Sequence, residues 1–101
     1  MSSIEQRQAT LRDLSFALRH PDTWPKDFDW NYSDCHKCAM GLAYRMWPQQ
    51  IKEPTTQAMV DGFGMQVTMA SEIFTAASRH AKSSIRGVTP AIIADMIDEL
   101  V

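Results

Sequence analysis

Helix-breaking residues divide this chain into short segments, and this limits what it can fold into. Prolines stand at positions 21, 25, 48, 54 and 90, and glycines at 41, 62, 64 and 87. Between them, apolar residues recur at intervals of three and four, which is typical of amphipathic helices, and no convincing pair of strands is present. The sequence therefore predicts an all-α fold: one domain over residues 1–101, a compact bundle of about four short helices with an extended aromatic-rich loop.

Two helices are expected in the N-terminal half. The first covers residues 4–19, where Ser3 opens a weak capping box and Pro21 stops the helix. The second covers residues 33–46, with Ser33 as its N-cap, because a side-chain oxygen there can accept a hydrogen bond from the first turn.

The C-terminal half is expected to contain one short helix and two longer ones. The short helix covers residues 55–61 and ends at Gly62. The next helix fades into the polar run 78–86, and its apolar stripe comprises Val67, Ala70, Ile73, Phe74 and Ala77. The last helix has the clearest start, with Thr89 as N-cap and Pro90 in the first turn. Its expected inward residues are Ile92, Ile93, Met96, Ile97 and Leu100, and its expected outward residues are Asp95, Asp98 and Glu99.

Charge and hydropathy exclude several classes of function. The formal net charge is −2, with 10 Lys and Arg against 12 Asp and Glu, so nucleic acid is an unlikely partner. Apolar runs fall far short of the roughly 20 residues that span a bilayer, so no membrane association is expected. The N-terminus lacks the pattern of a secretory signal, and we expect a cytoplasmic protein. No nucleophile elbow, phosphate loop or paired-acid motif is present, so we expect no cofactor, and a non-enzymatic protein is the favoured interpretation.

The one motif that could carry chemistry is Cys35-His36-Lys37-Cys38. In a helix over residues 33–46, both thiols would lie in the first two turns, where the helix dipole and unpaired amides stabilise a thiolate. Thiol redox chemistry or soft-metal binding by Cys35 and Cys38, with His36 as a further ligand, is one interpretation. A thioredoxin-like setting is missing, and two thiols are too few for a closed zinc site.

Packing is the favoured interpretation of the two cysteines. They begin an apolar stripe at helical spacing that continues through Ala39, Leu42 and Met46. Free cysteine behaves as a small hydrophobic residue and is among the most buried types. We therefore expect both sulfur atoms to point into the core.

Aromatic residues gather in the segment before the cysteines and give the second functional hypothesis. Burial of such rings would complete a small core, whereas exposed rings would be anchors for another protein. The candidate partner-binding residues are Trp24, Phe28, Trp30, Tyr32 and Trp47.

The segment from Phe28 to Ala43 contains the pattern C-x-x-C-A-x-G-L-A. With the later strings Phe63-Gly-Met and Val88-Thr-Pro, it resembles a loose group of small uncharacterised bacterial and phage proteins. The resemblance implies a compact microbial domain and carries no activity.

The leading hypothesis is a non-enzymatic regulator or inhibitor of bacterial or phage origin that binds another protein. Thiol chemistry at Cys35 and Cys38 is the alternative, and self-association into a homo-oligomer through the last helix is a third.

Overall fold

The structure is a computed structural model that describes residues 8–34, 36–80, 82, 84 and 87–101. Over these residues the chain forms six α-helices and one 3-10 helix and no strand, which confirms the all-α prediction with more helices than expected. Their bounds are α2 Leu11–Arg19, η1 Pro21–Thr23, α3 Ala39–Met46, α4 Thr56–Phe63, α5 Val67–Phe74, α6 Ala77–His80 and α7 Pro90–Leu100. None of these helices combines the length and hydropathy needed to cross a bilayer.

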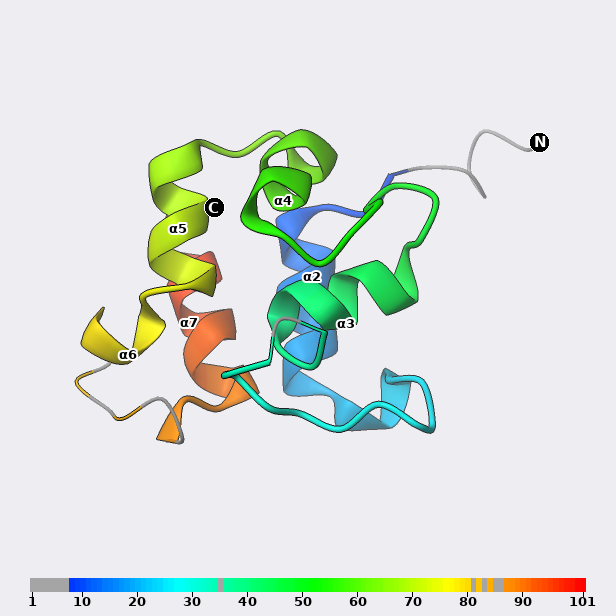
Figure 1. The fold of residues 1–101 in the computed structure, drawn as a ribbon, viewed down its shortest axis with the longest axis horizontal. Coiled ribbons are helices and arrows are strands. Elements are labelled where there is room, and N and C mark those ends of the chain that lie inside the picture. Colours follow the sequence, from blue (N-terminus) through cyan, green and yellow to red (C-terminus); the bar gives the residue numbers. More distant parts are fainter. Residues whose placement is uncertain (1–7, 35, 81, 83, 85–86) are drawn as a thin grey trace.

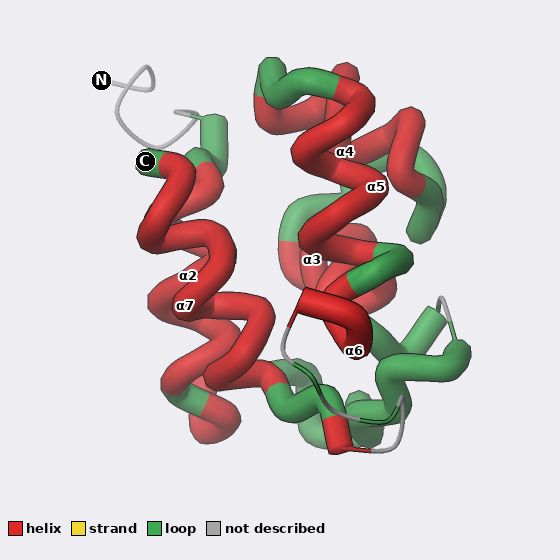
Figure 2. The backbone as a smooth tube through the Cα atoms, turned by 90° about the vertical axis from the view of Figure 1, so that its left-hand side faces the viewer, coloured by secondary structure: helices red, strands yellow, loops and turns green. Residues whose placement is uncertain are grey.

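The first and last of the described long helices form the main pair of the fold. Figure 2 shows α2 and α7 together on one side of the molecule, with α3, α4 and α5 on the other. Helices α4 and α5 pack on each other, and α5 also contacts α7, with the two running in opposite directions (Figure 1). The largest fully buried side chains come from both groups and include Leu14, Leu18, Leu42, Ile51, Met59, Ile93 and Ile97.

Helix α2 begins at Leu11, so the prediction of helix over residues 8–10 is wrong, while its expected end before Pro21 is confirmed. Thr10 and Asp13 cap each other's backbone amides and thereby fix the first turn. The Gln50 side-chain amide bonds both the N–H and the carbonyl of Ala9, each at 2.8 Å, and holds that residue outside the helix. The predicted cap at Ser3 lies outside the described residues.

Helix α3 begins at Ala39, so the prediction that the helix starts at Ser33 is wrong. Two short polar side chains bond the backbone locally and compete with the helix. Asn31 Oδ1 accepts from Ser33 N–H at 3.1 Å, and Asp34 Oδ1 accepts from His36 N–H at 2.9 Å.

This loop then folds back onto the first turn of α3. A Cβ at position 41 would stand 2.1 Å from the His36 carbonyl oxygen, so only glycine allows the approach. The close packing that Gly41 permits is therefore between loop backbone and helix.

The remaining helices follow the expected order with shifted ends. Thr55 caps α4 as an N-cap, but α4 continues through Gly62 to Phe63, and Gly64 is its C-cap, with a left-handed φ of 68°. Helix α5 ends before Thr75, whose hydroxyl bonds the Ser71 carbonyl at 2.6 Å. Ala77 then opens the separate helix α6. Thr89 and Pro90 start α7 as predicted.

Candidate functional site

The face of α7 that turns toward α5 borders an open groove of about 600 Å³. Helix α5 contributes one wall and α7 the other. The apolar lining residues are Met69, Ile73, Ile92, Met96 and Leu100. Ile73 is buried and forms the floor, whereas Met69, Ile92 and Met96 are half-buried and Leu100 is 39% exposed. The groove is therefore an apolar surface that the fold leaves partly uncovered.

The core-facing side of α7 differs from the one expected from the sequence. Ile93, Ala94 and Ile97 are fully buried. Ile92 and Met96, which were expected to point inward, pack against the core but are only half-buried and also line the groove. Leu100, also expected inward, is exposed at the groove. At 100° per residue, Ile92, Ile93 and Ala94 are spread over about 200° of the circumference of α7. Met96, Ile97 and Leu100 fall within the same arc. One neighbouring helix cannot cover so wide an arc, and this signal was present in the sequence.

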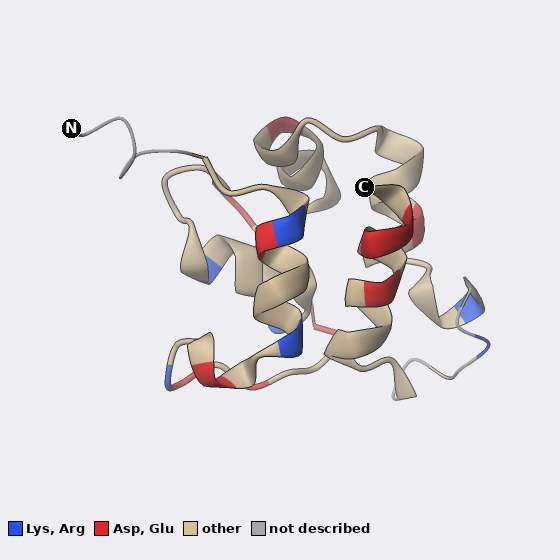
Figure 3. Ribbon diagram, turned by 180° about the vertical axis from the view of Figure 1, so that it is seen from behind, with Lys and Arg blue, Asp and Glu red and all other residues tan. Residues whose placement is uncertain are grey.

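Acidic side chains border the groove. Glu72 belongs to α5, and Asp95 and Glu99 belong to α7. Figure 3 shows acidic residues and no Lys or Arg on α7, the helix that leads to the C-terminus. On α7, Asp95 and Glu99 follow the apolar residues Ile92 and Met96 by three positions each, so they lie next to them on the helix surface.

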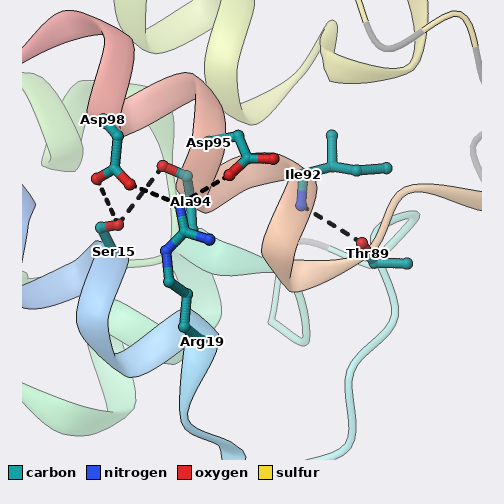
Figure 4. Close-up of polar contacts among 7 residues, drawn as sticks. All are labelled: Ser15, Arg19, Thr89, Ile92, Ala94, Asp95 and Asp98. Carbon is teal, nitrogen blue, oxygen red and sulfur yellow. Dashed lines mark hydrogen bonds and ion pairs between the residues drawn. The ribbon is translucent and has the colours of Figure 1, made fainter.

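On its other side α7 contacts α2 through a compact polar network (Figure 4). Ser15 Oγ donates to Asp98 Oδ1 at 2.7 Å, and the Arg19 guanidinium bonds both Asp98 and Asp95, the latter at 2.7 Å. The hydrogen bond from Ser15 and then the one from Arg19 lower the pKa of Asp98. The same two carboxylates raise the pKa of Arg19. These contacts fix α7 against α2 and give Asp98, which was expected only as an outward residue, a structural role.

The aromatic residues predicted to bind a partner lie against the core. The segment that carries most of them passes along one end of the molecule (Figure 1). Trp24 Nε1–H donates to the Ala17 carbonyl at 2.6 Å, and Trp30 Nε1–H donates to the Val88 carbonyl at 3.0 Å. Their rings are half-buried, and Phe28 is 7% exposed. The rings therefore connect α2 to the start of α7.

Tyr32 and Trp47 also make internal contacts. The Tyr32 hydroxyl accepts from the Ala77 N–H at 2.9 Å, at the start of α6, and burial raises the pKa of Tyr32. Trp47 packs edge-on against Phe63, with ring centroids 6.2 Å apart. Both side chains are half-buried. A role in partner binding for the aromatic set stays a prediction.

The candidate thiol site is described only in part. Cys38 is the N-cap of α3 and is 1% exposed, as expected for a packed sulfur. His36 is exposed in the loop before it, and Cys35 lies outside the described residues. Within the described part of the chain, no group of three or more His, Cys, Asp or Glu could hold a metal ion. The prediction that both thiols share the first turns of one helix is wrong, because that helix begins after Cys38.

Comparisons with known proteins add no relative from which a site could be transferred: no family model, curated protein or solved structure matches this chain.

Proposed function

We propose that this chain is a small non-enzymatic domain that regulates or inhibits another protein by binding it. The groove between α5 and α7 receives the apolar face of a helix from that partner. The single observation that supports this function is the width of the apolar arc of α7. The arc is about twice as wide as the apolar stripe with which an ordinary surface helix packs on its core. Half of that arc is fully buried in the core, whereas Ile92, Met96 and Leu100 line the groove and keep part of their surface uncovered.

The dimensions of the groove fit a helix. From Ile92 to Leu100, α7 rises about 12 Å, which equals roughly two turns of a partner helix. A partner with apolar residues at positions i, i+3, i+4 and i+7 would place them along this length. Met69 and Met96 in the walls would adapt to their shapes, because methionine is unbranched and flexible.

Two other occupants fit the groove less well. A second copy of this chain, paired groove to groove about a twofold axis, would bring its own acidic rim against this one. A specific small-molecule site would have polar groups placed inside an apolar pocket, whereas the polar groups here are carboxylates at the rim.

A displayed library of amphipathic helical peptides tests the proposal. Peptides that bind the unchanged chain are selected, and their affinities for that chain and for the Met96→Gln variant are compared. The variant replaces an apolar groove side chain by a neutral polar one of similar size. We expect at least about a tenfold loss of affinity, because a central apolar contact is lost. The matched control is Phe16→Gln, since Phe16 is 57% exposed on α2 and does not line the groove.

The outcomes separate the candidate surfaces. Loss of binding with Met96→Gln and retention with Phe16→Gln support the groove. Equal binding to Met96→Gln and to the unchanged chain overturns it. Sedimentation is run in parallel, and a dimer that Met96→Gln dissociates would replace the partner by a second copy.

A further inference from the structure

The charge of the groove helices specifies the chemistry of the partner. Resting on the proposed function, we infer that the bound helix is basic, with Lys or Arg on both sides of its apolar stripe. Helices α5 and α7 together carry four acidic residues and no Lys or Arg. They are Glu72, Asp95, Asp98 and Glu99.

The three carboxylates of α7 differ in how far the chain itself neutralises them. Asp98 is bound by both Ser15 and Arg19 on the α2 side. Asp95 also bonds Arg19, although its side chain is 66% exposed. Glu99 is exposed at the groove rim, and within the described part of the chain no cation lies within ion-pair distance of it. Of these three, Glu99 is therefore the carboxylate most available to a partner's cation.

Glu99 stands where a cation next to the partner's apolar stripe would arrive. It follows Met96 by three positions, so the two side chains are neighbours on the surface of α7. A Lys or Arg side chain can lie with its aliphatic carbons along apolar residues and place its charged end at a carboxylate beyond them. One basic residue could thus contact both Met96 and Glu99.

The same charges would reject acidic partners. A Glu or Asp next to the partner's stripe would face Asp95 and Glu99 of this chain, and like charges brought together weaken binding. The apolar lining would hold many amphipathic helices, whereas the rim would select among them.

Two synthetic helical peptides with the same leucine stripe test the inference. One carries Lys and Arg at every polar position and the other carries Glu. Affinities are measured by calorimetry at about 0.02 M and about 0.3 M salt, because screening weakens exposed charge pairs. We expect the basic peptide to bind at least about tenfold more tightly at low salt, with a smaller difference at high salt.

Charge reversal in the protein provides the second arm. Glu99→Lys is expected to weaken binding of the basic peptide about fivefold, because an attraction at the rim becomes a repulsion. Glu53→Lys makes the same change of net charge at an exposed residue outside the groove and is expected to leave the affinity unchanged. Circular dichroism confirms that both variants fold.

The results distinguish this inference from the proposed function. If neither peptide binds, both are overturned. If the two peptides bind equally, or if Glu99→Lys and Glu53→Lys give the same affinity for the basic peptide, the groove remains a binding surface and the inference of a basic partner is wrong.

Discussion

The two sides of α7 use the same kinds of residue in opposite ways. On the side that packs in the core and against α2, Ile93 and Ile97 are fully buried, and Asp98 is held by Ser15 and Arg19. On the side facing α5, isoleucine and methionine stay half-exposed, and Glu99 has no cation near it among the described residues. Both sides belong to one helix of 11 residues.

The difference shows which contacts the fold needs for itself. Apolar burial stabilises a folded chain in proportion to the area removed from water, so the α2 side stabilises the fold far more than the groove side. The apolar groups along the groove stabilise the free domain little. A partner helix would complete their burial, and this is why we assign binding to that side.

Truncation of matched isoleucines gives the largest expected effect. Ile97→Ala removes a fully buried side chain of α7 from the core and is expected to lower the free energy of unfolding by about 3 kcal/mol. Ile92→Ala makes the same chemical change at the half-exposed groove and is expected to cost less than about 1.5 kcal/mol. Urea unfolding of both variants gives the comparison directly.

Equal losses for the two variants would contradict the division of α7 into a closed and an open side. In the proposed complex the order should reverse, so that Ile92→Ala weakens peptide binding more than Ile97→Ala.

The aromatic segment offers a second, smaller comparison. Trp30→Phe keeps a ring against the core but removes the donor to the Val88 carbonyl, whose residue is 2% exposed. We expect a loss of about 1 to 2 kcal/mol in the free energy of unfolding, because a buried acceptor loses its partner.

Trp47→Phe is the control for Trp30→Phe. It keeps the edge-on contact with Phe63, and we expect it to cost less than about 1 kcal/mol. A loss for Trp30→Phe no larger than for Trp47→Phe would contradict a structural role for the Trp30 hydrogen bond and would favour partner binding by the aromatic segment.

Local capping and apolar spacing predicted most of the helices, because both signals depend on residues close in sequence. Thr89 with Pro90 located the start of α7, and Pro21 the end of α2. The predicted start of α3 was wrong. Ser33 resembles an N-cap in the sequence, but Asn31 and Asp34 hold the backbone in turns. Which of two competing local hydrogen-bond patterns forms depends on the loop's packing near Gly41, and the sequence does not show that packing.

The groove was missed for a different reason. The sequence shows that α7 has an apolar arc, but not which part of it faces α2 and which faces α5. The residues beside α7 that decide this are Ser15 and Arg19, which lie more than 70 positions away in the chain. Their bonds to Asp98 and Asp95 orient α7, and three of the five residues expected to point inward line the groove.

Acid titration of Asp98 gives the smallest expected effect and tests that orientation. Bonds from Ser15 and Arg19 lower its pKa below the ordinary value of 3.8. Above that value, Asp98 is ionised in both the folded and the unfolded chain, and the stabilisation is fully present. As pH falls below 3.8, the unfolded chain takes up the proton first, and the stabilisation is lost progressively through the folded pKa.

Ser15→Ala removes the largest cause of the shift, so we expect the Asp98 pKa to rise toward 3.8 and the acid-dependent part of the stability to shrink. Carbon-detected NMR of the side-chain carboxyls measures the pKa of Asp98 in the unchanged chain and in Ser15→Ala. Arg45→Gln is the control, because Arg45 lowers the pKa of Asp27 and makes no bond to α7 among the described residues. It should raise the pKa of Asp27 and leave that of Asp98 unchanged. An Asp98 pKa that Ser15→Ala does not move would mean that the serine does not hold α7, and the separation of its two sides would then need another cause.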